Sequence, residues 1–600
     1  MLPQNIQNLG VKTYFEFILS FLPKDYKSGV LSRDLEIDTQ SVLEVEVLNY
    51  SHFKIAKVLC FAPFFSQEIE LIIFNAKPYH KSIFKKGEHL VVSGKLQKNM
   101  GFYQLIQPQI IKEVGKITPI FNARGAKSLL LQNFCKEINV QNLVLQYANI
   151  PINFLESLER IYNPNEAFFK AFKKNHGFFD KYLDSIKFVE IYEHIRKLKT
   201  KKRVFKSLAK LQGNIDSWIK SLPFSLTNGQ LNAIADIKKS LNSEQSARRV
   251  IIGDVGCGKT MIIFASVLLA LPKRSILMAP TSILAKQIYE ESKKFLPKNL
   301  SVALLTQNSK IGDVENCDFL IGTHAVLYKD LKDFSLVMID EQHRFGTAQR
   351  NTLERMFENK SKRPHILQFS ATPIPRTLAM IESSFLDFSF IKDLPFKKDI
   401  TSKVIHKNDF KELLAHLKKE LSVGNQAIIV YPLVEQSDAM NYLSLKEGEE
   451  FWKKNFSGVY VTHGKDKEKE ATLEEFREKG SILLATTVIE VGISLPKLST
   501  IVIVGAERLG LATLHQLRGR VSRNGLKGYC FLYTNMQKNE RLERFCGILN
   551  GFEIAQMDLE YRNSGDLLSG EAQSGKQFNF INLTRDEKII VEAKRALDRD

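Results

Sequence analysis

The spacing of hydrophobic and polar positions changes character several times along the 600-residue chain. Near the amino end a helical repeat predicts a helical segment over 1–40, with an apolar stripe formed by Tyr14, Phe15, Ile18, Leu19 and Leu22. Over 41–115 short alternating runs such as EIELIIFN predict five strands, and hence a small barrel or sandwich. Helical spacing returns over 116–220 and predicts a helical linker.

The rest of the chain alternates apolar strand-like runs with amphipathic segments, which is the pattern of parallel α/β sheets. It divides into two stretches of similar texture, 221–395 and 396–545, followed by a glycine-interrupted region, 546–600. We therefore expect a multidomain α/β protein with two parallel-sheet lobes, preceded by a small β domain and a helical linker.

The net charge of the chain indicates which kinds of binding partner to expect. The formal charge is +19, with 85 Lys and Arg against 66 Asp and Glu, and such an excess favours nucleic acid or an anionic membrane surface. No apolar run approaches the roughly 18 residues of a membrane span, and MLPQNIQNLG lacks the features of a secretion signal. The six cysteines are scattered without a CxxC pair, which argues against a zinc module or a disulfide framework. We expect a cytoplasmic protein that is not bound to membranes.

A phosphate-binding loop stands between an apolar strand and an apolar helix. The segment 253–260 satisfies GxxxxGK[ST], whose glycines let backbone N–H groups turn toward phosphate oxygens. Lys259 suits the β- and γ-phosphates, and the Thr260 hydroxyl suits Mg²⁺. We expect ATP and Mg²⁺ as cofactors, with these nucleotide-binding candidates: Gly253, Asp254, Val255, Gly256, Cys257, Gly258, Lys259 and Thr260.

Two further segments complete the chemistry of hydrolysis. The apolar run 336–339 ends in Asp340, a candidate magnesium partner, and Glu341, a candidate base for the attacking water. The segment HQLRGRVSR at 515–523 carries three arginines, of which Arg520 and Arg523 are candidate fingers for the γ-phosphate. A solvated basic helix is the alternative for this segment.

Further segments occur in the order of the motor motifs of superfamily 2 helicases and translocases, which the chain resembles: APT at 279–281, GTH at 322–324, SATP at 370–373 and ATTVIEVG at 485–492. The resemblance implies that three threonines contact phosphates of a nucleic-acid strand, namely Thr281, Thr323 and Thr487. It also implies that His343, Ser370 and Thr372 relay the nucleotide state. Gln516 joins the catalytic group, and Gln230 reads adenine.

Within this superfamily, SATPIPRTLAM and ERLGLATLHQLRGR resemble the RecG family. The segment 551–575 resembles the TRG motif, a helical hairpin and loop shared with the transcription-repair coupling factor, and implies coupling roles for Arg562 and Gln573. The segment 41–115 resembles the RecG wedge domain, an OB-fold-like barrel. Phe74 and Tyr79 are the expected base-stacking residues, although either could simply pack the barrel.

The RecG resemblance implies two RecA-like motor lobes behind an OB-fold-like wedge. The expected function is an ATP-dependent double-stranded DNA translocase that unwinds branched DNA, reverses stalled forks and branch-migrates Holliday junctions. Its partners would be forks and four-way junctions, with a single-strand-binding protein as a further candidate, and we expect a monomer. Alternatives are a transcription-repair coupling translocase, an RNA helicase, or a junction-binding protein with a decayed motor.

Several positions depart from the family pattern. Ser522 stands where the family usually has glycine, Ser494 where it has an acidic residue, and 563–564 where it has Gly-Pro. The basic run 196–203 is either a DNA contact or a solvated face of a linker helix, and the latter is slightly favoured because nothing periodic or base-reading marks it.

Overall fold

The structure is a computed structural model that describes the chain except for residues 1, 100, 202–203, 324, 327–333, 342–360, 433–441, 443, 465, 467, 487–494, 523–524, 570–577 and 600. The side chains of 201, 376 and 562–569 are also outside the description. The chain forms two compact units. One comprises 1–197, 576–582 and 586–600, and the other comprises 198–575 and 583–585.

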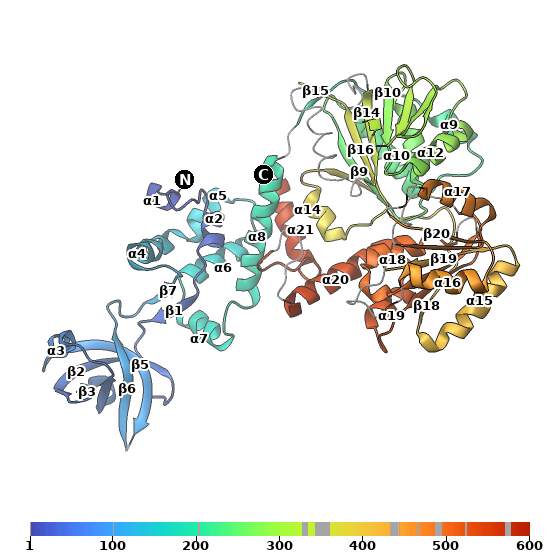
Figure 1. Cartoon of the computed structure of the whole chain (residues 1–600). Coiled ribbons are helices and arrows are strands. Elements are labelled where there is room, and N and C mark those ends of the chain that lie inside the picture. Colours follow the sequence, from blue (N-terminus) through green and yellow to red (C-terminus); the bar gives the residue numbers. More distant parts are fainter. Residues whose placement is uncertain are drawn as a thin grey trace. The chain divides into compact units, whose positions relative to one another are not determined.

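The first unit contains a closed five-stranded barrel in the order β2-β3-β4-β6-β5 (Figure 1). Its strands are β2 (Gln40–His52), β3 (Ala56–Ala62), β4 (Gln67–Ile73), β5 (His89–Asn99) and β6 (Phe102–Ile110). Alternate residues such as Val45, Val58 and Leu71 fill the interior, as the two-residue repeat of a strand dictates. A 3₁₀ turn (Pro63–Phe65) and α3 (Pro78–Ile83) connect strands. The five strands expected from the alternating runs are confirmed, and they close into a barrel rather than a sandwich.

Helices make up most of the remainder of this unit. They are α1 (Gln4–Gln7), α2 (Tyr14–Ser20), α4 (Gly125–Phe134), α5 (Val140–Gln146), α6 (Ile152–Tyr162), α7 (Glu166–Lys174), α8 (Asp180–Lys201) and α21 (Glu587–Asp598). The expectation of a helical segment over 1–40 is wrong for β1 (Asp25–Ser28), which pairs with β7 (Ile117–Ile120). That partner lies far along the chain, so local periodicity could not reveal it.

The chain returns to the first unit after residue 577, where the buried carboxylate of Glu190 in α8 holds it. The Glu190 oxygens accept hydrogen bonds from the backbone N–H groups of Asn579 (2.6 Å), Phe580 (2.9 Å) and Ile581 (2.9 Å). Lys187, one turn earlier in α8, pairs with Asp586 at 2.8 Å. The segment that follows 570–577 is thus fastened to α8.

The second unit begins with a lobe built on an eight-stranded sheet of order β12-β11-β13-β10-β14-β16-β9-β17, parallel except for β12. Its strands are β9 (Arg248–Gly253), β10 (Arg274–Met278), β11 (Val302–Leu305), β12 (Lys310–Ile311), β13 (Phe319–Gly322), β14 (Phe334–Asp340), β16 (His365–Ser370) and β17 (Asp387–Ile391). Its helices are α9 (Asp216–Ser221), α10 (Asn228–Leu241), α11 (Lys259–Ala270), α12 (Ser282–Phe295) and α14 (Arg376–Glu382). Residues 261–270 of α11 are all buried, so this helix lies in the core.

The second lobe has a six-stranded parallel sheet of order β18-β23-β22-β19-β21-β20. Its strands are β18 (Ile400–Ile405), β19 (Gln426–Tyr431), β20 (Val459–Thr462), β21 (Ile482–Thr486), β22 (Leu498–Val504) and β23 (Gly528–Tyr533). Its helices are α15 (Phe410–Ser422), α16 (Leu445–Asn455), α17 (Lys469–Lys479), α18 (Leu511–Arg518), α19 (Glu540–Gly547) and α20 (Gly551–Ser569). The two expected parallel-sheet lobes are confirmed.

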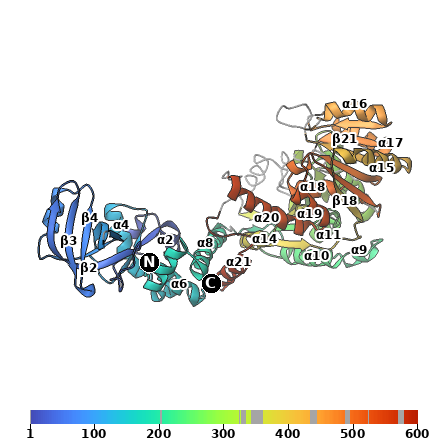
Figure 2. The same ribbon diagram turned by 90° about the horizontal axis from the view of Figure 1, so that it is seen from below.

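Helix α20 belongs to the second lobe. It packs beside α18 (Figure 2), and its Ile554 and Met557 join the buried cluster of that lobe. In the part of the chain that the structure describes, no helix is long and apolar enough to span a membrane.

Candidate nucleotide-binding site

The loop between β9 and α11 has the backbone that phosphate binding requires. Gly256 and Gly258 adopt φ of 82° and 79°, in the left-handed region that favours glycine. Gly258 caps α11, and a Cβ there would collide with the Gln230 side chain. The amino end of α11, with its unpaired N–H groups and positive dipole end, therefore borders the loop and suits a polyphosphate.

Two side chains hold this loop in shape. The Lys259 ammonium donates to the carbonyls of Gly253 (2.9 Å) and Asp254 (3.3 Å). The Gln230 amide donates to the Cys257 carbonyl at 2.8 Å and accepts from the Thr227 N–H at 2.8 Å, in a capping box at the start of α10. Gln230 thus supports the loop from behind, and its contact with adenine stays a prediction.

The two acidic candidates lie at the carboxyl end of β14. This strand pairs with β16, which in turn pairs with β9, the strand that leads into the phosphate loop. Burial, followed by the charge of Glu341, raises the pKa of Asp340 to about 7, while Lys259 opposes the shift. Among the described residues the Asp340 Oδ1 atom is buried without a hydrogen-bond partner. A buried carboxylate oxygen without a hydrogen-bond partner is costly, and a divalent cation can satisfy it. The Asp340 carboxylate therefore fits Mg²⁺, and the part of Thr260 as a second ligand stays a prediction.

Glu341 connects the acidic pair to the SAT segment. Its backbone is held at φ +51°, an uncommon conformation for this residue, and its Oε1 accepts from the Ala371 N–H at 2.8 Å. In the same loop the Thr372 N–H donates to Ser370 Oγ at 3.1 Å. The base candidate and the relay candidates Ser370 and Thr372 are thus brought together.

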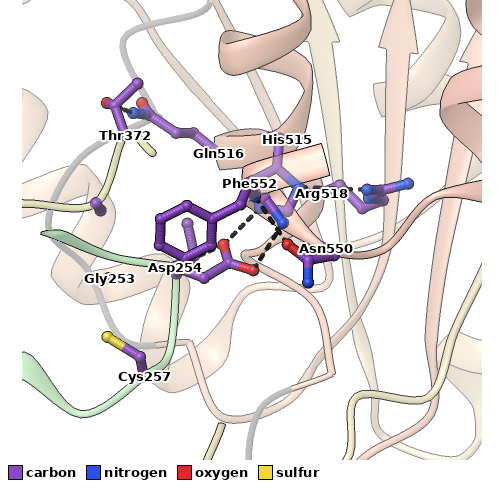
Figure 3. Close-up of polar contacts among 12 residues, drawn as sticks. Gly253, Asp254, Cys257, Thr372, His515, Gln516, Arg518, Asn550 and Phe552 are labelled. Atoms are coloured by element: carbon purple, nitrogen blue, oxygen red, sulfur yellow. Dashed lines mark hydrogen bonds and ion pairs between the residues drawn. The ribbon is translucent and has the colours of Figure 1, made fainter. Parts of the chain in front are cut away.

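The SAT segment in turn reaches the second lobe. The Gln516 side chain of α18 donates from Nε2 to Thr372 Oγ1 at 2.8 Å (Figure 3). Hydrogen bonds at each end of the SAT loop therefore connect Glu341, the candidate base, to Gln516 of the other lobe. Such a connection is what nucleotide-dependent movement between two lobes requires.

A second contact between the lobes, which the sequence reading did not single out, centres on Asp254 (Figure 3). His515 Nε2 lies 2.5 Å from Asp254 Oδ1, the Gly551 N–H donates to Oδ2 at 3.1 Å, and the Lys398 ammonium lies 3.8 Å away. His515 and Arg518 lie three residues apart on α18, a spacing that places both on one face of the helix and is the one sequence signal for this cluster.

One of the three arginines of the 515–523 segment serves the interior of the second lobe. Arg518 is 1% exposed, and its guanidinium donates to the carbonyls of Phe545 (2.9 Å) and Ile548 (2.6 Å). It therefore orders the connection between α19 and α20. Arg520 is partly buried and follows α18 directly. Arg523 lies outside the described residues.

The structure describes only some of the residues of the two lobes that are expected to contact nucleic acid or to relay the nucleotide state. Thr281 caps α12 by accepting from the Leu284 N–H at 3.3 Å. Thr323 is buried, and its Oγ1 has no hydrogen-bond partner among the described residues. Thr487, His343 and Gln573 lie outside the described residues, and Arg562 lies in α20 with its side chain outside the description.

The two aromatic wedge candidates are on the barrel surface. Phe74 is 42% exposed and Tyr79 is 54% exposed, so packing of the barrel interior does not account for either. Asn75 between them adopts φ +53°, which turns the chain out of β4. Strand register places the β2–β3 turn at this same barrel end, and that turn carries Phe53, 93% exposed, which the sequence reading missed.

Known families match this architecture. Residues 227–381 match the DEAD/DEAH box helicase family, and residues 408–525 match the helicase conserved C-terminal domain. The ATP-dependent DNA helicase RecG of Helicobacter pylori is 47% identical to this chain over 603 residues, covering 98% of the chain and 96% of the relative. The chain belongs to the RecG family. RecG of Thermotoga maritima is 31% identical, covering 98% of the chain and 81% of the relative.

A solved structure of RecG bound to a three-way DNA junction has 27% sequence identity to this RecG-family chain and a TM-score of 0.56, covering 98% of the chain and 84% of that structure. Matches over nearly the whole chain include the barrel as well as both lobes. The backbone conformation of Ser522 explains why the RecG family usually has glycine at this position. Ser522 adopts φ +60°, which suits the family's usual glycine, and its Oγ accepts from the Asp399 N–H at 3.2 Å.

Proposed function

We propose that this RecG-family chain is an ATP-dependent double-stranded DNA translocase that unwinds branched DNA, reverses stalled replication forks and branch-migrates Holliday junctions. The observation that carries the proposal is the connection from Glu341 through the SAT loop to Gln516, which links a nucleotide site to a second lobe by hydrogen bonds at each end of the loop. The relatives named ATP-dependent DNA helicase RecG, and the RecG structure bound to a three-way junction, support DNA as the substrate.

The residues of the site divide the work. The amino end of α11 and Lys259 bind the phosphates, Asp340 and Thr260 hold Mg²⁺, and Glu341 orients and deprotonates the attacking water. Bound Mg²⁺ would neutralise charge on the transferred phosphoryl group. Arg520 and Arg523 of the second lobe stabilise the same charge, so hydrolysis depends on the lobes being closed.

Movement follows from that dependence. Each cycle of binding and hydrolysis opens and closes the lobes, and Thr281, Thr323 and Thr487 grip strand phosphates while they move. Phosphate contacts carry no base code, so the enzyme recognises the shape of DNA rather than its sequence. The barrel, with Phe74 and Tyr79 exposed, separates strands at the branch point by stacking on bases, at about 1–3 kcal/mol per base.

Several finer points belong to this proposal. The enzyme acts as a monomer in the cytoplasm, and a single-strand-binding protein is one of its partners. Another superfamily 2 motor, such as a transcription-repair coupling translocase or an RNA helicase, is not favoured, because the 47% identity to RecG runs through the barrel as well as the lobes.

The test is the ATPase rate of the purified chain on a panel of forks, four-way junctions, linear duplex, single strands and RNA. Forks and four-way junctions should stimulate hydrolysis most. Strongest stimulation by RNA, or equal stimulation by linear duplex and forks, would contradict the proposal.

A further inference from the structure

Asp254 lies inside the phosphate loop, and both oxygens of its side chain make hydrogen bonds. Its Oδ1 accepts from the Val255 N–H (2.6 Å) and contacts His515 (2.5 Å), while its Oδ2 accepts from the Gly551 N–H (3.1 Å). Lys398, from the connection between the two lobes, completes the set at 3.8 Å. A single buried carboxylate thus joins the phosphate loop to α18 and to the first residue of α20.

Hydrogen-bonding capacity fixes the proton on His515. Arg518 lies 3.2 Å from His515 Nδ1, and a guanidinium has only donors, so Nδ1 must accept and Nε2 must carry the hydrogen that is donated to Asp254. The ring is therefore neutral, in keeping with the burial that lowers the pKa of His515. Although burial disfavours its charged form, the His515 hydrogen bond and the Lys398 charge hold the pKa of Asp254 below its ordinary value.

Arg518 extends this contact toward α20. Besides His515, it binds the carbonyls of Phe545 and Ile548 and lies over the Phe545 ring at 4.0 Å. These groups form the connection that leads into Gly551. The contacts therefore run from Asp254 to His515, from there to Arg518, and on to the 545–548 connection. They return to Asp254 through the Gly551 N–H.

The first residue of α20, Gly551, packs tightly against Asp254 and His515. A Cβ on Gly551 would come within 2.7 Å of Asp254 Oδ1 and 2.8 Å of His515 Nε2, so glycine is required for the close approach. The next residue, Phe552, packs edge-to-face against Phe390 of β17 in the first lobe, with ring centroids 6.1 Å apart. Two residues later α20 is in the core of the second lobe through Ile554. Its first turn is therefore held by both lobes.

We propose that Asp254 is a positioning residue for coupling. Its carboxylate fastens the first turn of α20 to the phosphate loop, so that movement of the loop during the ATP cycle is delivered directly to α20 and the segment behind it. This inference rests on the proposed translocase function, and it adds a second route beside the one through Gln516 and Thr372.

The decisive variant is Gly551→Ala in the full-length chain, because its methyl group would collide with Asp254 and His515 and so disrupt their contact with α20, while Gly551 itself is not a nucleotide-binding candidate. Gly547→Ala is the matched control, since a Cβ there meets nothing within 4 Å among the described residues. The measurements are ATPase without DNA, ATPase with a fork, and ATP consumed per fork unwound. Gly551→Ala should keep its DNA-free ATPase but consume about ten-fold more ATP per fork, the factor that matches one lost charge-assisted hydrogen bond. Gly547→Ala should match the wild type.

A second variant separates coupling from folding. Asp254→Asn keeps the shape of the side chain, but its amide cannot accept from both His515 and Gly551. It should raise the ATP consumed per fork as Gly551→Ala does, and the double variant should add little, because both changes break the same contact.

Unchanged ATP consumption per fork in Gly551→Ala would overturn the inference, and so would a loss of ATPase and unwinding in equal proportion. If the wild type unwound no fork at all, the proposed function would fail and this inference with it. If the wild type and Gly547→Ala unwound forks and Gly551→Ala did so equally well, only the role of Asp254 would fail.

Discussion

Glu190 offers the sharpest test of how the segment behind α20 is held. Glu190 is 8% exposed, and its carboxylate accepts hydrogen bonds from the backbone N–H groups of Asn579, Phe580 and Ile581. Glu190→Gln keeps the volume of the side chain but removes its charge and one accepting oxygen. If the remaining oxygen serves Phe580 and Ile581, the Asn579 N–H, now at 2.6 Å from Oε1, would face an amide N–H₂ group.

The size of the effect follows from these contacts. A hydrogen bond to a charged group is worth about 1.5–3 kcal/mol, and a neutral one about half of that. One bond is lost and two are weakened by about half, so the local free energy of docking for 578–582 should fall by about 3–6 kcal/mol. The global melting temperature should change less, because the segment can detach without unfolding the unit.

Hydrogen exchange measures this quantity directly. At tenfold for each 1.4 kcal/mol, the amides of 579–581 should exchange about 100-fold faster or more in Glu190→Gln. Glu156→Gln, an exposed position on α6 of the same unit, is the control and should leave these amides unchanged. Fork unwinding should also fall in Glu190→Gln, while ATPase without DNA stays at the wild-type rate.

Two results would refute this reasoning. If the three amides kept their wild-type exchange rates in Glu190→Gln, the carboxylate would not be what fastens the segment. If exchange rose as expected but fork unwinding per ATP did not change, the anchor would have no part in coupling.

Three further changes test other parts of the site. Lys259→Ala should abolish ATP hydrolysis but leave binding to a three-way junction intact in a gel-shift assay, whereas equal loss of both would contradict the assignment. Replacing Phe74 and Tyr79 together with alanine should slow fork unwinding at least ten-fold, from about 1–3 kcal/mol per stacked base, with no change in DNA-free ATPase; unwinding at the wild-type rate would rule out the wedge role. Asp340→Asn should abolish hydrolysis yet raise the melting temperature at pH 8, because burial lifts the folded-state pKa of Asp340 to about 7, and the aspartate therefore costs stability as the pH rises from its unfolded-state pKa of about 3.9 to about 7. The stabilisation should vanish below about pH 3, where the aspartate is protonated in both the folded and unfolded states, and no rise at pH 8 would refute it.

Motifs that act through neighbouring residues could be predicted from the sequence. The phosphate loop is one, because its glycines, Lys259 and Thr260 work through local backbone geometry between one strand and one helix. The barrel is another, because the two-residue alternation directly reports which side chains face inward. The exposure of Phe74 and Tyr79 could not be predicted, since an exposed and a buried aromatic look alike in an alternating run.

Contacts between residues far apart in the chain could not be predicted from local sequence patterns. Asp254 and His515 are 261 positions apart, and Asp254 and Gly551 are 297 apart, so no spacing rule joins them. Arg518 belongs to an arginine-rich run in the sequence, yet carbonyl groups and an aromatic ring around it satisfy its charge in the interior. Sequence spacing shows that it shares a helix face with His515 but not what that face meets.

The central claim is that ATP cleavage between the two lobes draws a duplex past the barrel and displaces strands. The most direct measurement mixes the purified full-length chain, Mg²⁺ and ATP with a fork of homologous arms, and follows conversion to a four-way junction alongside phosphate release, with Lys259→Ala as the control. We predict junction formation that tracks phosphate release in the wild type and is absent in the variant. Rapid phosphate release on forks with no strand displaced would contradict the account.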